Sequence, residues 1–328
     1  LYITKRIYYN DLFQSTEYSE DLNIGEEFHC LNGFHSQHQN TFGSNYLDII
    51  DLDSIYQEDL IEQSIKRLVL HEVGHTLGLN HNFKGSTLLS IDQIKDKDLV
   101  AKKGLCNSVM EYPAINIASN IDDQTLFYDT VPGIYDIWAI TFGYHDFDEK
   151  FTKEWLSSSS DPWLSFANDA DDMRSPGKGI DPFAMINDLT NEPVQYSVER
   201  MDLIISLVSK LRDKYSLEAE SYQKLKNAFL TLLNEYKNCV SIISRQIGGV
   251  EVSRSFFNSK ETQDPPLKPI NYDSQKEAVN ILGQYLFSPE SFIFSDSIYS
   301  YLQIQRRGFN IPFSGEDPKI MDGGINPK

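Results

Sequence analysis

The 328-residue sequence has few cysteines, few basic side chains and no long apolar run. Its three cysteines, Cys30, Cys106 and Cys239, are far apart and form neither a CxxC pair nor an even disulfide framework. One disulfide with one remaining thiol is an alternative, but the spacing favours three buried thiols. No apolar run reaches the roughly 18 residues that a membrane-spanning helix needs. The sequence therefore predicts neither a disulfide-rich scaffold nor a membrane-spanning segment.

The charge balance is strongly acidic. The chain has 29 Lys and Arg against 48 Asp and Glu, which gives a net charge of −19. Because phosphate binding requires clustered Lys and Arg, this balance argues against nucleic acid or an anionic membrane surface as a partner. Hydrophobic residues make up 40% of the chain and charged residues 23%, which is typical of a globular protein. The length is sufficient for one large domain or two ordinary ones.

The most informative segment is residues 71–82, which read HEVGHTLGLNHN. His71 and His75 are four residues apart, so on a helix both imidazoles project from one face and can bind one ion. Gly78 can adopt the left-handed conformation that ends a helix, after which His81 can approach the same ion. Glu72 lies on the flank of that face, where it can reach a metal-bound water without being a ligand. Three imidazoles with an open fourth position predict a catalytic zinc site.

This motif is specific, and it resembles a known one. The five fixed positions of HExxHxxGxxH would arise by accident with a probability on the order of 10⁻⁵. They resemble the elongated zinc motif of the metzincin clan of peptidases at every defining position. The clan's second signature is a tight turn with a methionine, and SVMEY at residues 108–112 is similar to it. The resemblance implies that Met110 forms an apolar floor under the imidazoles and that Tyr112 approaches the zinc or the oxyanion; a core Met and a core Tyr are the alternative.

A wider resemblance runs from about residue 65 to about 290. The segments SVMEYP, GIYDIWAITFGY and SRQIGGVEVSRS are similar to those of a family of large bacterial exported metzincin-like proteins. That likeness implies an extracytoplasmic location, whether periplasmic, cell-surface or secreted. The chain begins at Leu1 without an export signal, which we expect to lie upstream. Clan geometry further implies a pocket for the side chain after the scissile bond, walled by Pro113, Ala114, Ile115 and Asn116.

We expect an α+β fold, with a metzincin-like catalytic half followed by a mainly α-helical C-terminal half. The catalytic region is predicted at residues 1–150, a loop-rich connection at 151–197 and the helical region at 198–328. Only about 55 residues precede the active-site helix, where metzincins place most of a sheet, so we expect an N-terminally truncated and small sheet. The predicted elements are a β-like stretch at 2–9, an active-site helix from about Ser54 to Gly78, a short buried helix at 133–144, and helices at 198–215, 222–247 and 274–287.

Three weaker sequence patterns can each be interpreted in more than one way. Ser54 and Gln57 have the spacing of a capping box at the start of the active-site helix. A second metal site is conceivable at His29, Cys30, His35 and His38, but the spacing favours a loop and the start of a helix. Calcium could bind Asn168, Asp169, Asp171 and Asp172, but the run lacks the glycine and glutamate of an EF-hand, which favours a solvated acidic loop with Arg174 as a partner for one carboxylate.

These observations predict a zinc-dependent endopeptidase that acts on protein or peptide substrates. His71, His75 and His81 would hold one Zn²⁺, and Glu72 would act as general base on the attacking water. The main alternative is a non-catalytic extracellular binding or scaffold protein that retains its zinc, and a hydrolase of a non-peptide bond is another. The intact Glu72 argues against the scaffold, because a structural zinc site needs no base.

Overall fold

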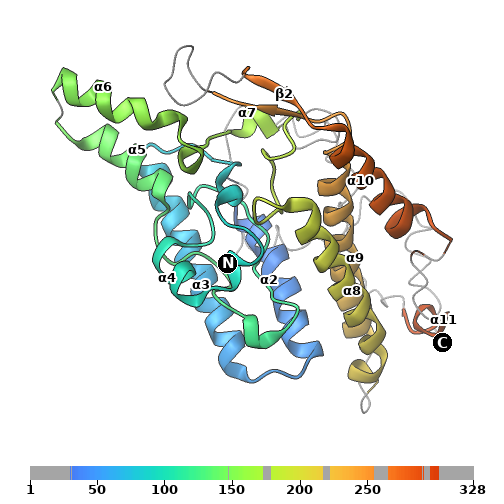
Figure 1. Ribbon diagram of the computed structural model, residues 1–328. Coiled ribbons are helices and arrows are strands. Elements are labelled where there is room, and N and C mark those ends of the chain that lie inside the picture. The colour runs from blue at the N-terminus through green and yellow to red at the C-terminus, as the bar shows by residue number, and fades with distance from the viewer. Residues whose placement is uncertain are drawn as a thin grey trace, which may run out of the picture. The chain divides into compact units, whose positions relative to one another are not determined.

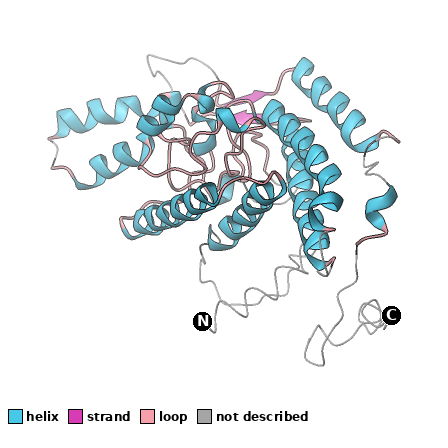
Figure 2. Cartoon of the chain, turned by 90° about the horizontal axis from the view of Figure 1, so that it is seen from below, coloured by secondary structure: helices cyan, strands magenta, loops and turns pink. Residues whose placement is uncertain are grey.

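The computed structural model describes residues 30, 32–146, 148–172, 179–216, 222–254, 265–289, 291 and 296–302. Contacts divide the chain into two units, Leu1–Leu31 and Asn32–Lys328, and every element named below belongs to the second. Helices dominate the described residues, while the strands β1 (Val250–Val252) and β2 (Leu267–Pro269) form a small antiparallel sheet, shown in magenta in Figure 2. The predicted α+β class is therefore confirmed. The predicted domain boundaries stay a prediction, and the β-like stretch at 2–9 lies outside the described residues.

The described helices follow one another along the chain as labelled in Figure 1. Those before residue 180 are α2 (Asn32–Ile49), α3 (Ser54–Thr76), α4 (Lys97–Lys103), α5 (Ile134–Tyr144), α6 (Glu149–Ser157) and α7 (Asp169–Asp172). Those after it are α8 (Pro193–Tyr215), α9 (Gln223–Ser244), α10 (Tyr272–Leu282), which continues in a π-helical turn at Gly283–Phe287, and α11 (Asp296–Tyr299). Short 3-10 turns lie at Gly85–Leu88, Gln93–Lys95, Ile121–Asp123, Ser158–Ser160 and Pro162–Leu164. The helices predicted at 133–144, 198–215, 222–247 and 274–287 correspond to α5, α8, α9 and α10.

The helix α2 extends further than predicted, since only a loop and the start of a helix were expected around residues 29–38. Its buried residues Gln39, Phe42, Tyr46 and Leu47 recur at helical spacing. It contacts α3, α8 and α9, and α8 and α9 pack along each other (Figure 1). The largest buried apolar cluster contains residues from all four helices. The helix with the zinc motif and the C-terminal helices therefore share one core.

The start of α3 differs from the prediction. The helix follows Asp53, and no side chain caps it. Gln57 instead bonds to α2: its amide donates to the Ser44 carbonyl at 3.2 Å, and the Ser44 hydroxyl donates to its amide oxygen at 3.1 Å. The predicted capping box of Ser54 and Gln57 is therefore wrong, because the Gln57 side chain is hydrogen-bonded to Ser44 of α2.

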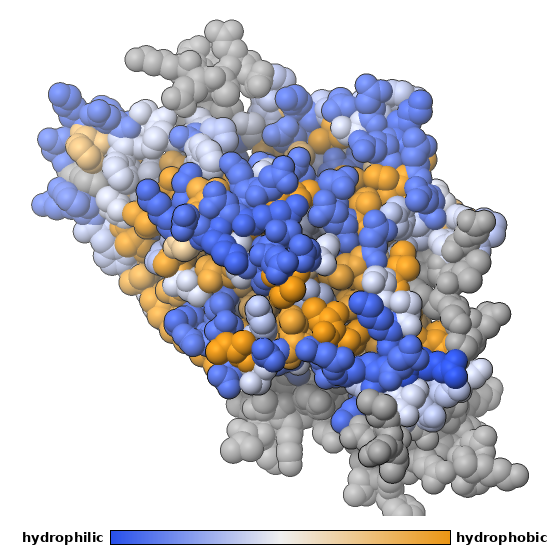
Figure 3. All heavy atoms as spheres, turned by 60° about the horizontal axis from the view of Figure 1, so that its bottom comes forward, coloured by the Kyte–Doolittle hydropathy of each residue, from blue (hydrophilic) through white to orange (hydrophobic). Residues whose placement is uncertain are grey.

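The buried face of α3 is its more polar face. The residues Ile61, Ile65, Val69 and Val73 expose between 46% and 57% of their surface. The buried residues of α3 are Leu60, Ser64, Arg67, His71 and Gly74. The packing of α2 and of residues 107–112 explains this choice, since Ser64 bonds to Asn40 of α2 and Arg67 donates to the Glu111 carbonyl. Figure 3 shows apolar surface, in orange, between hydrophilic groups on the face that it presents.

The helix α5 was expected to be buried, and this is wrong. Its residues Ile134, Ile137, Phe142 and Tyr144 expose between 43% and 66% of their surface. The one buried residue of α5 is Asp136, which binds the segment 108–109. The helix α5 therefore binds the turn at residues 108–109 through the Asp136 carboxylate and contributes little to a hydrophobic core.

Two of the three cysteines agree with the prediction of buried thiols. Cys106 and Cys239 are buried thiols, and burial raises the pKa of each. Cys30 is half-buried. Within the residues that the structure describes, no helix is both long enough and apolar enough to span a membrane.

A buried acid connects α2, α8 and α9. Glu235 of α9 is 1% exposed, and its carboxylate lies 3.7 Å from Arg200 Nε, 3.4 Å from His38 Nε2 and 3.2 Å from Gln39 Nε2. Burial opposes ionisation, but His38 and the Arg200 charge outweigh it and lower the pKa of Glu235 from 4.5 to about 2. Because the folded-state pKa is depressed, the stabilisation is present above about pH 5 and is lost as the pH falls towards 2.

We predict that Glu235→Gln lowers the free energy of unfolding at pH 7 by on the order of 3 kcal/mol, because Arg200 would stay buried without its counter-charge. Denaturant titration should also show a shallower loss of stability between pH 5 and pH 2 for the variant than for the wild type. Glu62→Gln, which removes a solvent-screened surface pair with Lys66, is the control and should leave the stability nearly unchanged. Equal pH slopes for wild type and Glu235→Gln would contradict this assignment.

Candidate metal centre

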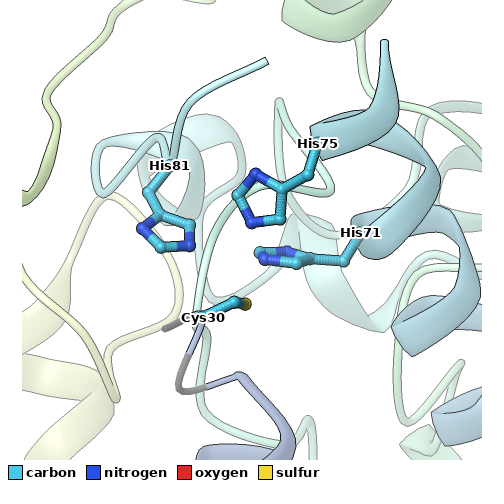
Figure 4. A group of neighbouring side chains, drawn as sticks. All are labelled: Cys30, His71, His75 and His81. Carbon is cyan, nitrogen blue, oxygen red and sulfur yellow. The ribbon is translucent and has the colours of Figure 1, made fainter. Parts of the chain in front are cut away.

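Three histidines converge at the end of α3. His71 and His75 extend from one side of the helix, and His81 faces them from the chain that follows it (Figure 4). Their nearest ring nitrogens lie within 4.8 Å of one another. The helix ends at Thr76, and Gly78 has a φ of 89°, the left-handed conformation that the sequence analysis expected there. The turn at Gly78 thus brings His81 back to the helix face that carries the other two histidines.

Each imidazole is oriented by a bond at Nδ1. His71 Nδ1 lies 2.7 Å from the Val109 carbonyl, His75 Nδ1 lies 3.1 Å from the Leu79 carbonyl, and His81 Nδ1 lies 2.7 Å from a carboxylate oxygen of Asp169. All three partners are acceptors, so the proton of each neutral ring resides on Nδ1. Each Nε2 is therefore the unprotonated nitrogen of its ring, on the side where the three rings meet.

The donor set fits a zinc ion. Burial and the charge of Arg67 lower the pKa of His71 to about 2, which keeps this imidazole neutral. His75 Nε2 is buried and has no hydrogen-bond partner within the described residues. A buried polar atom of this kind is costly, and a metal ion would satisfy it. Three neutral imidazole nitrogens with one further position are typical of catalytic zinc sites.

The turn at residues 108–110 lies against α3. The Asp136 carboxylate accepts bonds from the Ser108 hydroxyl at 2.6 Å and from the Val109 amide at 2.8 Å, which fixes the turn. Met110 is fully buried, and a Cβ added to Gly74 would lie 2.4 Å from its sulfur. The absence of a side chain at Gly74, between His71 and His75, therefore leaves room for Met110 against the helix, and its role as a floor under the imidazoles stays a prediction.

Tyr112 is enclosed at the same site. It is 1% exposed, and its hydroxyl donates to His81 Nε2 at 3.0 Å. Its ring stacks on His35 of α2, with centroids 5.4 Å apart and planes inclined by 22°. Asn187 completes the support, because its amide donates to the Tyr112 carbonyl at 2.9 Å and its side-chain oxygen lies 3.0 Å from His35 Nε2. The roles of His35 and Asn187 could not be predicted from the sequence, since neither residue belongs to a local motif.

Of the histidines near residue 35, the two in the described part of the chain face different groups. His35 faces Asn187 and Tyr112, whereas His38 faces Glu235. His29 lies outside the described residues. The two imidazoles of α2 bind different partners, so the alternative of a shared metal site is wrong for His35 and His38.

The remaining predicted site residues are placed as follows. Glu72 is exposed on α3, next to His71. Pro113, Ala114, Ile115 and Asn116 are all buried. The Ala114 and Asn116 amides donate to the carbonyls of Asp188 and Phe127, and Asn116 lines a cavity of about 120 Å³ beside α8. Their role as a pocket wall stays a prediction.

The acidic side chains that follow residue 167 bind different partners. Asp169 binds His81, and the Asp171 carboxylate lies 2.5 Å from Arg254 Nη2. Arg174, which was expected to pair with this run, lies outside the described residues. The sequence analysis did not connect Asp169 with the zinc motif, because 88 residues separate it from His81.

We predict that Gly74→Ala destabilises the protein by about 1–3 kcal/mol, although alanine is the better helix former, because its methyl group would overlap the Met110 sulfur. Gly143→Ala in α5 is the matched control, because a Cβ there meets no atom within 4 Å. Thermal denaturation of both variants would test this. A Gly74→Ala variant as stable as Gly143→Ala would contradict the close contact.

Comparison with known proteins agrees with this geometry. No curated protein and no solved structure matches the chain. A protein-family model described as Met-zincin matches residues 54–322, a range that includes α3, the three histidines and the turn at Met110. Because the match covers most of the sequence, the chain belongs to the Met-zincin family.

Proposed function

We propose that this protein is a zinc-dependent endopeptidase. His71, His75 and His81 would hold one Zn²⁺ through their Nε2 atoms. The observation that carries the proposal is the orientation of the three rings: each Nδ1 faces an acceptor, and His75 Nε2 is buried without a hydrogen-bond partner among the described residues. Membership of the Met-zincin family supports a metallopeptidase-type site.

The side chains around the histidines can perform the proton transfers of peptide hydrolysis. Zinc, when bound, supplies a Lewis acid that lowers the pKa of a bound water towards about 7. Glu72 adjoins His71 and is exposed, so its carboxylate can accept a proton from the attacking water and then deliver it to the departing amine. The Tyr112 hydroxyl already donates a bond at the site and can donate to the oxyanion.

The surroundings of the site favour hydrolysis over a purely structural metal. A structural zinc site needs no general base. Here a carboxylate adjoins the first histidine and a buried hydroxyl adjoins the third. The competing function is that of a scaffold protein that retains zinc. A scaffold has no catalytic activity, so no substitution in it can reduce peptide turnover.

We further propose an extracytoplasmic location and protein or peptide substrates. The net charge of −19 supports a partner other than nucleic acid or an anionic membrane. The resemblance to exported metzincin-like proteins supports the location. Detection of the protein in periplasmic, surface or culture fractions of its source cells would test it, and its recovery in the cytoplasm alone would contradict it.

The metal assignment predicts close to one zinc per chain. His81→Ala should lower the zinc content measured by elemental analysis, because it removes one of three ligands. His145→Ala, a histidine exposed at the end of α5, is the control and should retain the wild-type content. Undiminished zinc in His81→Ala would show that the ligand assignment is wrong.

The base assignment predicts that Glu72→Gln reduces peptide turnover by about 10²- to 10⁴-fold while zinc content and melting temperature stay the same. The substitution keeps the size of the side chain and removes only the carboxylate that takes the proton. Glu58→Gln, an exposed acid on the same helix, is the control and should cleave at the wild-type rate. The assay uses a proteome-derived peptide library read by mass spectrometry.

Two results would decide against this mechanism. A zinc-loaded wild-type protein that cleaves no peptide in the library would favour the scaffold. A Glu72→Gln variant that cleaves as fast as the wild type would refute the role of Glu72 even if the activity itself is genuine.

A further inference from the structure

His81 is held differently from the other two histidines. His71 and His75 belong to α3, and their Nδ1 atoms face backbone carbonyls. His81 lies beyond the helix, and its Nδ1 is 2.7 Å from a carboxylate oxygen of Asp169 in α7. A hydrogen bond to a charged acceptor is about twice as strong as one to a neutral acceptor. A carboxylate at this position also makes the opposite ring nitrogen a stronger donor to a metal.

The backbone brings Asp169 to His81. The Phe83 amide donates to the Ala167 carbonyl at 2.7 Å, and the Ala167 amide donates to the Asn82 side chain at 3.2 Å. The segments that follow His81 and precede Asp169 are thus bonded together. The Asn82 amide also donates to the Met110 carbonyl, which ties the same segment to the turn beneath the histidines. The contact between His81 and Asp169 is therefore part of the packed site.

The chain after β1 supports the same short helix. Arg254, two residues past β1, pairs with Asp171 of α7 at 2.5 Å and lies over the Phe166 ring, 5.6 Å from its centroid. The end of β1 is itself fixed, because the Lys84 ammonium donates to the Val252 carbonyl at 2.7 Å. Arg254 thus contacts residues on both sides of Asp169, from a strand end that is bonded to the segment after His81.

We propose that Asp169 is a positioning residue for the metal centre, and that Arg254 holds α7 so that Asp169 stays on His81. Asp169 accepts the Nδ1 proton and directs His81 Nε2 to the point that His71 and His75 face. The proposal rests on the zinc site proposed above. It also gives the C-terminal half a part in that site, since Arg254 follows α9 and β1 in the chain.

The test measures zinc affinity and not turnover. Wild type, Asp169→Ala, Asp169→Asn and Asp122→Asn, all in the full chain, are titrated with zinc against a chromophoric chelator. Asp169→Ala should bind zinc about 10- to 100-fold more weakly than wild type. Asp169→Asn retains an acceptor without the charge and should lie between the two. Asp122→Asn removes the same charge from an exposed turn and should match the wild type, which separates positioning from the general attraction of an acidic chain for a cation.

A spectroscopic measurement separates positioning from loss of structure. The cobalt-substituted proteins should differ in their visible d–d absorption bands, because Asp169→Ala changes the orientation of one imidazole. The metal-free proteins should melt at the same temperature. Equal zinc affinities and equal cobalt spectra for Asp169→Ala and Asp122→Asn would overturn the proposal. A wild type that binds no zinc would overturn the metal centre itself, which is a different failure.

The role of Arg254 is tested by a double-mutant cycle. Arg254→Ala should weaken zinc binding in the wild-type background and have a smaller effect in the Asp169→Ala background, because it acts through Asp169. If Arg254→Ala changed zinc affinity equally in the wild-type and Asp169→Ala backgrounds, or in neither, the proposed coupling between Arg254 and Asp169 would be overturned. The role of Asp169 itself would still be decided by the zinc titration.

Discussion

The three imidazoles can present their Nε2 atoms to one point only because an acceptor stands at each Nδ1. The acceptors come from three parts of the chain: the turn before Met110, the segment just after α3, and α7. Much of the surrounding structure serves these contacts. Asp136 fixes the turn that carries Val109, and the segment of Ala167 brings Asp169 within reach. A fold that shifted any one of these segments would leave a ring free to rotate.

The protein surrounds this centre unevenly. His71 is fully buried, and Tyr112 is wedged among His35, Phe83 and the motif histidines. Glu72 and most of the apolar side chains of α3 lie towards solvent. The densely packed side of the site is therefore the side of the methionine turn and α2, and Glu72 lies on the solvent-exposed side. This division suits a hydrolase, in which the metal ligands must be fixed while substrate and water must enter.

The sequence was sufficient to predict those features that depend on the spacing of residues close together in the chain. His71, His75, Gly78 and His81 are close in the chain, and a helix followed by a left-handed glycine brings them together. The long amphipathic helices α8 and α9 were predicted for the same reason. The helix α2 could also have been predicted, because Gln39, Phe42 and Tyr46 are spaced as on a helix. The histidines of the same segment are also compatible with a metal cluster, so its local sequence has two interpretations.

Contacts between distant segments could not be predicted in this way. Asp169 reaches His81 across 88 residues, and His35 reaches Asn187 across 152. An acidic run and a histidine-rich stretch have several local interpretations, and only the packing selects among them. The same limit explains the sidedness of α3, where periodicity indicates an apolar face but does not say which neighbours will cover it.

The left-handed glycine at residue 78 has a thermodynamic consequence. A φ of 89° is open to glycine, whereas other residues would lose roughly 1–2 kcal/mol there. The direction in which the chain leaves α3 is thus fixed when the backbone folds, and the hydrogen bonds at Nδ1 then fix the rings. The conformational entropy of the three ligands is lost during folding and not when the ion arrives. A cation that enters this site meets a coordination sphere whose disorder has already been removed, so most of the interaction energy remains available as affinity.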